Sequence, residues 1–371
     1  MKNPKRIPKT TIIDIAKASG VSVSTVSRIL NNKPDVSEET RERVLAVIRD
    51  MQFTPQASWQ QLASGKSRFI TLHYPQNLTR IHTMNSFVIG AAAACEKLNY
   101  SLNIVVSPLD ENSLLSFFRS GQTDGMILME ILLHDWRVDL LRKANFPFVM
   151  FGHCENNTGL DFIDFDVEGG IRKAVDHLVE LGHREIGFIS AEPYIFTGSE
   201  IHNAYGHTHW SIKGYIDACA HYGLPVICEK VQVIKESVES RVTDMLNNHP
   251  NMTAILTSQD TAISGIIKAI QDRGLRIPED ISVVASAIEQ MAELTTPPLT
   301  TIDCNAEAAS YKAAVMLIEH LEGISEGNQQ ILFPFHLTVR GSTGKARSKA
   351  KDGINPVLRM AKGIKNTLIL R

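Results

Sequence analysis

The first fifty residues carry apolar positions three and four residues apart, the spacing of one helix face. Thr11 begins the first predicted helix with Asp14 at its capping-box position, and Gly20 ends it. Ser22 and Ser37 are the predicted N-caps of a second and a third helix. The predicted inward faces are Ile12, Ile15, Ala16 and Ala18, then Val26, Ile29 and Leu30, then Val44, Leu45, Val47, Ile48 and Met51. Three short helices, the first two joined by a glycine-containing turn, predict a helix-turn-helix unit.

From residue 69 onward, short apolar runs alternate with longer amphipathic stretches. The predicted strands are 69–74, 101–107, 125–130, 147–153, 185–190, 230–234, 254–258 and 281–286. The predicted helices between them are 86–100, 114–119, 169–183, 211–223, 239–248 and 261–274. Repeated strand–helix units predict an α/β fold of doubly wound parallel sheets. The units are too many for one compact sheet, so we expect two lobes with a ligand cleft at the strands' carboxyl ends.

Two segments lack enough apolar residues to form a core of their own. Residues 55–66 read as a linker that can become helical over 56–63, and the tail 344–371 holds eight basic residues and one acidic residue. The tail is expected to be disordered or to form one short terminal helix. The predicted organisation is therefore a head at 1–54, a linker at 55–66, a two-lobed core at 67–343 and a basic tail.

The charge distribution adds to this division. The net charge is −2, but residues 1–66 hold eleven Lys and Arg against six Asp and Glu, so the head carries +5 and the remainder −7. A basic head favours a polyanionic partner, the alternative being a solubilising N-terminus. No apolar run reaches membrane-spanning length, and no apolar segment follows the basic N-terminus. Five widely spaced cysteines without a C-x-x-C pair fit a reducing compartment, so the expected location is the cytoplasm.

The second predicted helix gathers polar side chains on the face opposite its apolar set. Ser24, Ser27, Arg28 and Asn31 fall at i, i+3, i+4 and i+7. A small helix with hydroxyls, an amide and one guanidinium suits base edges and phosphates in a DNA major groove. Val23, expected to be exposed at the helix start, could touch a thymine methyl group. The alternative is a merely solvated face, which would favour Lys and Glu over Ser.

The stretch "DIAKASGVSVSTVSRILNN" resembles the DNA-binding module of the LacI/GalR family of bacterial transcription regulators. Later stretches, "TDGMIL", "HLVELGHREIGFIS", "GLRIPEDISVV", "PPLTTI" and "VRGST", extend the resemblance to about Gly344. It implies that Val23 and Ser24 read bases beside Arg28, and that phosphates are held by Thr11, Ser22, Ser27, Asn31 and Thr40. It adds Thr25 and a hinge helix in which Leu62 wedges into the minor groove, with Trp59 and Ala63 beside it. Trp59 departs from the small residue usual at its position.

The resemblance also implies a core similar to type 1 periplasmic binding proteins, which binds a sugar or another small effector. The implied effector residues are His153, Asp166, Ser211, Gln259, Asp260 and Ala287. Ser211 and Ala287 replace an Arg and an Asp that commonly clamp sugar hydroxyls. The effector class therefore stays open among a sugar, a bulkier, less polar or differently charged ligand, and a pocket that has lost its ligand.

The expected function is a DNA-binding transcriptional regulator, taken to be a repressor, that binds a palindromic operator as a homodimer and responds to the effector. A solute-binding protein of a transport system is the alternative. Motifs of an enzyme are absent, and no cofactor, metal or membrane partner is expected. His202, His207 and His209 could hold a metal, but they lack companion ligands at suitable spacing and are better read as part of a loop at the cleft rim.

Overall fold

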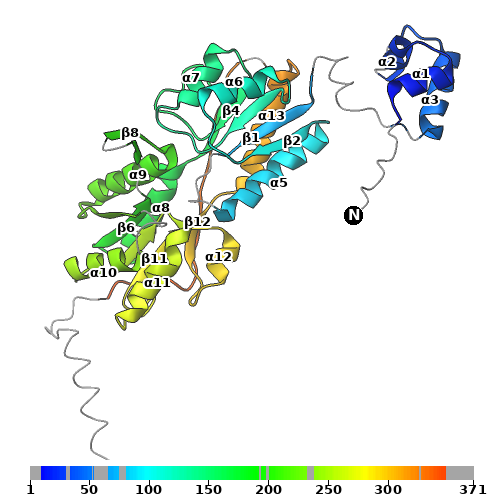
Figure 1. Ribbon diagram of the computed structural model, residues 1–371. Coiled ribbons are helices and arrows are strands. Elements are labelled where there is room, and N and C mark those ends of the chain that lie inside the picture. The colour runs from blue at the N-terminus through cyan, green and yellow to red at the C-terminus, as the bar shows by residue number, and fades with distance from the viewer. Residues whose placement is uncertain are drawn as a thin grey trace, which may run out of the picture.

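The computed structural model describes residues 10–30, 34–51, 53, 66–74, 81–191, 194–197, 200–231, 238–325 and 327–347. At the N-terminus, α1 (Ile12–Ser19), α2 (Val23–Leu30) and α3 (Glu38–Asp50) form the predicted three-helix head (Figure 1). Its buried core consists of Ile12, Ile15, Ala16, Val26, Ile29, Val44 and Phe53. Six of these seven were placed inward by the spacing of apolar residues, and Phe53 closes the cluster after α3.

The first lobe is a six-stranded parallel sheet in the order β13-β5-β4-β3-β1-β2. The strands are β1 (Phe69–His73), β2 (Ser101–Val105), β3 (Gly125–Leu128), β4 (Phe148–Phe151), β5 (Phe162–Phe165) and β13 (Gln330–Phe333). One face is covered by α5 (Ile81–Lys97) and α13 (Ala306–Leu321), the other by α6 (Glu111–Arg119) and α7 (Trp136–Lys143). Helices on both faces explain why the central strands β1, β3, β4 and β5 are buried along almost their whole length, whereas the edge strands β2 and β13 are partly exposed.

The second lobe repeats the plan in the order β14-β12-β11-β10-β6-β9. Its strands are β6 (Ile186–Ala191), β9 (Ile227–Val231), β10 (Ala254–Thr257), β11 (Ser282–Ser286), β12 (Thr300–Asp303) and the antiparallel edge strand β14 (His336–Thr338). Its helices are α8 (Val167–Glu180), α9 (Gly206–Tyr222), α10 (Val238–Asn248), η2 (Asp260–Ala262), α11 (Ile263–Asp272) and α12 (Glu289–Glu293). A hairpin of β7 (Tyr194–Thr197) and β8 (Glu200–Ala204) precedes α9.

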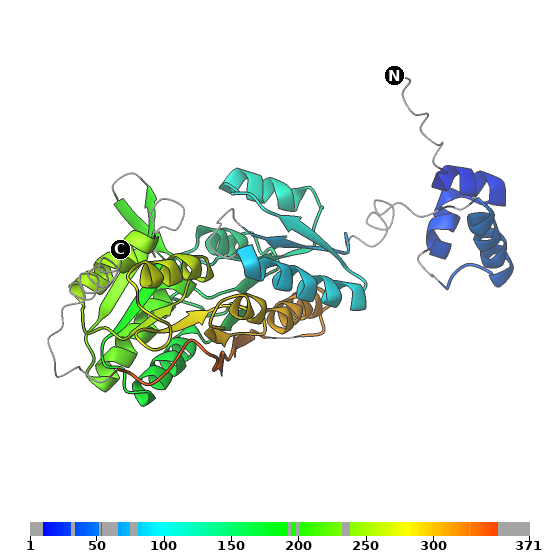
Figure 2. The ribbon, with the colours of Figure 1, turned by 90° about the horizontal axis from the view of Figure 1, so that it is seen from below.

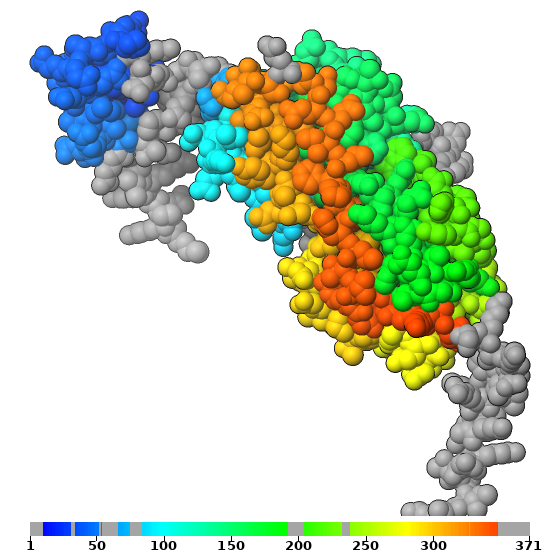
Figure 3. Space-filling model, turned by 180° about the vertical axis from the view of Figure 1, so that it is seen from behind, coloured from blue at the N-terminus to red at the C-terminus, as the bar shows by residue number. Residues whose placement is uncertain are grey.

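The chain passes between the two lobes three times: from β5 to α8, from β12 to α13, and from β13 to β14. The C-terminal segments therefore run along both lobes, as the orange and red surface in Figure 3 shows. Figure 2 shows the two sheets in succession along the core. The largest buried cluster draws residues from both lobes, including Phe165 at the end of β5 and Phe335 between β13 and β14. The predicted two-lobed, doubly wound α/β fold is confirmed.

Several elements differ from the predictions. β5, α7, the β7–β8 hairpin and every element after residue 286 were not predicted; β5 has only four residues and an internal aspartate, too little for a recognisable pattern. α9 begins at Gly206, five residues before the predicted start. Beyond the predicted core boundary at 343, the chain stays in contact with the second lobe through bonds from Ala346 N to Leu181 O and from Arg347 to Pro250 O. The rest of the predicted tail lies outside the described residues.

Candidate DNA interface and effector cleft

The start of α2 is built by capping at both sides of a tight turn. Thr11 and Asp14 form the predicted capping box of α1, and Gly20 ends that helix with a φ of 69°. The Ser22 hydroxyl accepts the Thr25 N–H at 3.1 Å, the N-cap bond predicted for α2. Ser37 is at the N-cap of α3, but its hydroxyl donates to Thr40 Oγ1 at 2.9 Å and makes no capping bond to the backbone.

The outer face of α2 is polar and accessible. Ser24 and Arg28 are exposed, and the hydroxyls of Ser24 and Thr25 lie 2.7 and 2.8 Å from that of Ser22. Arg28 Nε lies 3.5 Å from Asp35 Oδ2, with both side chains more than half exposed. This weak pair orients the guanidinium without burying it, so its remaining donors stay accessible.

Several predicted DNA-contacting residues are partly buried, form bonds within the head or lie outside the described residues. Val23 is half-buried and packs against the head core, so only part of its side chain is exposed at the helix start. Thr11 is engaged in its capping box, while Ser27 and Thr40 are half-buried. Four predicted contacts, Asn31, Trp59, Leu62 and Ala63, lie outside the described residues.

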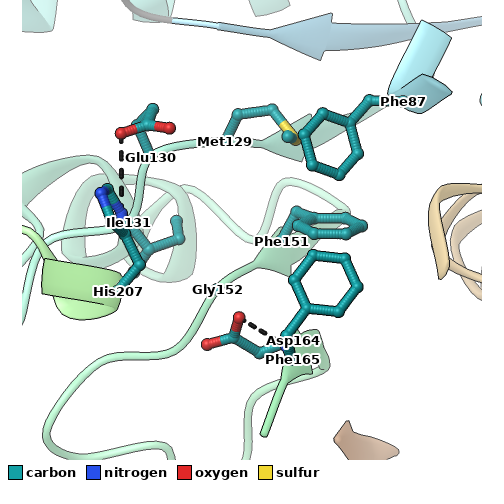
Figure 4. Close-up of a pocket in the computed structure, with 9 residues that line it drawn as sticks. All are labelled: Phe87, Met129, Glu130, Ile131, Phe151, Gly152, Asp164, Phe165 and His207. Carbon is teal, nitrogen blue, oxygen red and sulfur yellow. Dashed lines mark hydrogen bonds and ion pairs between the residues drawn. The ribbon is translucent and has the colours of Figure 1, made fainter. Parts of the chain in front are cut away.

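A hollow lies at the carboxyl ends of β3, β4 and β5, where α9 approaches the first lobe (Figure 4). Its free volume is about 30 Å³. Three phenylalanine rings form one wall: the centroids of Phe87 and Phe151 are 4.8 Å apart and those of Phe151 and Phe165 are 5.4 Å apart. The complete lining is Phe87, Met129, Glu130, Ile131, Phe151, Gly152, Asp164, Phe165 and His207.

The acidic group at the rim of this hollow is held by an unusual turn. Glu130 has a φ of 53°, a left-handed conformation that is costly for a residue with a side chain. The buried Arg137 stabilises the turn by donating from Nη2 to the carbonyls of Met129 at 3.1 Å and Glu130 at 3.0 Å. Asp135 neutralises Arg137 through bonds of 2.6 and 2.9 Å. The Arg137 guanidinium thus stabilises the backbone of the turn, and the Glu130 carboxylate faces the hollow.

Contacts between the lobes close the cleft beside the hollow. The Leu133 N–H donates to the Ala204 carbonyl and the Gly206 N–H to the Ile131 carbonyl, both at 2.9 Å. His207 of α9 lies 3.8 Å from the Glu130 carboxylate. These contacts tie the hairpin and the start of α9 to the first lobe.

A second histidine–carboxylate pair lies next to the hollow. His153 Nδ1 is 2.6 Å from Asp164 Oδ2, and its ring stacks between Phe162 and Trp210 with centroid distances of 5.2 and 4.8 Å. Asp164 Oδ1 also accepts the Phe165 N–H. Burial lowers the pKa of the neighbouring His209 from its usual value. His153 was predicted from the sequence, whereas its carboxylate partner was not.

The six predicted effector residues do not form the lining of the hollow. Asp166 caps α8 by accepting the Gly169 N–H at 2.9 Å. Ser211 is buried and donates to the Thr208 carbonyl, within 3.5 Å of the Ser190 and Ser258 hydroxyls.

Gln259, Asp260 and Ala287 follow the carboxyl ends of β10 and β11, all at most 8% exposed. Neither amide atom of Gln259 has a hydrogen-bond partner within the described ranges. Burying an amide without hydrogen-bond partners costs free energy, so the Gln259 amide is suited to binding a polar ligand or a water.

Sequence reasoning missed Glu130, Asp164 and the phenylalanine wall, and it assigned His207 only to a loop at the cleft rim. Two signals were present: an acidic residue inside the apolar run "FIDF", and one that ends the run "GMILME". Over the described part of the chain, no group of three or more His, Cys, Asp or Glu side chains could hold a metal ion, and none of the helices there could span a membrane. The side chain of His202, one of the histidines considered for a metal, is not described.

Comparisons with known proteins agree with this architecture. Residues 11–56 match the profile of the bacterial regulatory proteins of the lacI family, and residues 175–343 match that of the periplasmic binding protein-like domain. Catabolite control protein A of Priestia megaterium is 27% identical over 344 residues, covering 90% of this chain and 99% of that protein.

Two solved structures show the same fold over most of the chain. A lac repressor dimer bound to operator and the anti-inducer ONPF superposes with a TM-score of 0.76 at 25% identity, covering 91% of this chain and 99% of that chain. A complex of the regulator CelR with cellobiose gives a TM-score of 0.66 at 22% identity, covering 90% and 100%.

Proposed function

Because this chain belongs to the LacI family of bacterial regulatory proteins, we propose that it is a transcriptional repressor whose operator affinity is set by a small molecule bound between its lobes. The observation that carries the proposal is the exposed polar face of α2, on a capped helix fixed to its own core. A solute-binding transport protein requires the two lobes, but its function does not require this helix-turn-helix head. A cytoplasmic location is part of the same proposal, because a protein that binds operator DNA must reach the chromosome.

In the proposed complex, α2 enters the major groove. We assign base contacts to Ser24 and Arg28, which are exposed, and phosphate contacts to the hydroxyls of Ser22, Thr25, Ser27 and Thr40. One head reads a half-site, so two chains related by a two-fold axis would read a palindrome. The similar lac repressor structure is a dimer bound to operator.

The proposed effector site is the interlobe hollow. Ser211 and Ala287 offer no charge on the second lobe, but Glu130 and Asp164 on the first lobe are buried carboxylates that can accept hydroxyl hydrogen bonds. The phenylalanine wall can cover the apolar face of a sugar ring. A sugar-related effector is also in keeping with the cellobiose bound by CelR.

The hollow's volume bears on how the effector enters. About 30 Å³ is far below the roughly 300–1,000 Å³ of a typical ligand pocket. An effector therefore needs the lobes to separate, which breaks the bonds that Ala204 and Gly206 make to the first lobe. Ligand binding and lobe arrangement are thereby linked, and any effect of the ligand on DNA affinity must be reciprocal.

The test is selection of DNA from a random pool by the full-length protein, followed by gel shifts at several salt concentrations. A recovered palindrome bound with steep salt dependence supports the proposal. Absence of any enriched palindrome would refute it. A panel of mono- and disaccharides is then added to the complex, and Glu130→Gln should reduce the response to whichever sugar shifts operator affinity.

A further inference from the structure

The described core begins at Lys66, and two carboxylates hold its first three residues. Asp124 accepts the Ser67 N–H at 2.6 Å, the Ser67 hydroxyl at 2.8 Å and the Arg68 N–H at 2.8 Å. Arg68 has a φ of 60°, a backbone conformation that a residue with a side chain adopts only when its surroundings enforce it. Asp124 therefore fixes a sharp turn where the linker from the head meets the first lobe.

Glu322 completes the hold from the other side. Its Oε1 accepts Lys66 Nζ at 3.1 Å, Arg68 Nη1 at 3.0 Å and the Tyr100 hydroxyl at 2.7 Å. Lys66 Nζ also donates to the Leu321 carbonyl at 3.0 Å, and the Arg68 guanidinium lies 5.1 Å from the centroid of the Tyr100 ring. The bond from Tyr100 holds the pKa of Glu322 below its usual value, so Glu322 stays charged at neutral pH.

Both carboxylates are attached to rigid parts of the first lobe. Asp124 directly precedes β3, and Glu322 is the C-cap of α13, which packs on β3 and α5. The contact between β3 and α13 is close, since a Cβ added at Gly125 would lie 2.9 Å from Leu317 Cδ1. Contacts with the first lobe, rather than the linker, thus fix the position of residues 66–68.

We propose that Asp124 and Glu322 form a clamp that fixes where, and in which direction, each head leaves the core, and so sets the half-site spacing that a dimer accepts. This rests on the proposed function, because it requires two heads reading one palindrome. Isolated exposed ion pairs contribute little, but here six hydrogen bonds from four residues converge on two carboxylates. Neither carboxylate need touch DNA, so both are positioning residues.

The experiment uses full-length protein and the palindrome recovered by selection, together with versions whose centre is one or two base pairs longer or shorter. The variants are Glu322→Gln, Asp124→Asn and the double variant, with Tyr100→Phe as a milder change that keeps the ring beneath Arg68. Glu319→Gln is the matched control, since it removes the same charge from the same helix one turn earlier. The quantity compared is the ratio of affinities for altered and original spacing.

We expect the natural chain and Glu319→Gln to lose about tenfold or more in affinity per altered spacing, and the double variant to lose only about two- to threefold. Equal spacing discrimination in the double variant and the natural chain would overturn the clamp. Tighter binding to every DNA with unchanged discrimination would also overturn it, since that is the signature of Lys66 and Arg68 released to bind phosphates. If the natural chain selects no palindrome, the proposed function itself has failed.

Discussion

Replacing Arg28 with alanine tests the DNA interface with little disturbance of the fold. The only ion pair that Arg28 makes, within the described head, is the 3.5 Å contact with Asp35, and both side chains are more than half exposed. Such a pair contributes at most about 1 kcal/mol, so the head should unfold at nearly the same temperature. The buried residues of α2, Val26 and Ile29, are unaffected.

The expected loss in DNA binding is much larger than the loss in stability. A guanidinium contact to a base edge is worth about 1–3 kcal/mol, and a dimer loses two of them. The sum of about 2–6 kcal/mol corresponds to roughly 30-fold to more than 10,000-fold in operator affinity. Fluorescence anisotropy on the selected palindrome and on an unrelated duplex, over a salt series, measures both affinity and specificity.

The salt series also separates two roles for Arg28. Loss of a base contact lowers operator affinity selectively, whereas loss of a phosphate contact weakens all DNA and reduces the salt slope by about one per head. Arg43→Ala, which removes an exposed arginine from α3, is the control for charge. Operator affinity unchanged in Arg28→Ala, with Arg43→Ala equally silent, would refute the assignment of α2 as the reading helix.

Three further predictions concern stability. Tyr215→Phe should lower the free energy of unfolding in urea by about 1–3 kcal/mol, because the fully buried hydroxyl donates to the Ile186 carbonyl at 2.7 Å and accepts the Ile227 N–H at 3.0 Å. An unchanged urea midpoint would contradict this. Burial lowers the pKa of His183 to about 4, so the unfolded chain binds the proton more readily than the folded chain. The free energy of unfolding should therefore be highest above about pH 6.5 and fall towards pH 4. His183→Gln should flatten that fall in thermal unfolding followed by circular dichroism. Gly20→Ala should destabilise the head by about 1 kcal/mol through backbone strain, since among the described residues no atom apart from those of the chain neighbours lies within 4 Å of the added Cβ. Gly20→Asn should cost less in the same melts.

The sequence by itself determined the head almost completely. Its caps at Thr11 and Ser22, the stop at Gly20 and the inward residues Val26 and Ile29 all follow from contacts within a few positions along the chain. Such local rules act before any tertiary contact forms, which is why the pattern could be read directly. The alternation of strands and helices and the two lobes could be predicted for the same reason.

Only the tertiary structure decided which side chains share a site. Asp164 lies in a four-residue strand, Glu130 in a left-handed turn held by Arg137, and His207 at a helix start five residues earlier than predicted. Their proximity depends on strand order and on the approach of α9 to the first lobe, neither of which leaves a periodic signal. The clamp is similar: Lys66 and Glu322 are 256 positions apart and meet only because α13 returns to the first lobe beside β3.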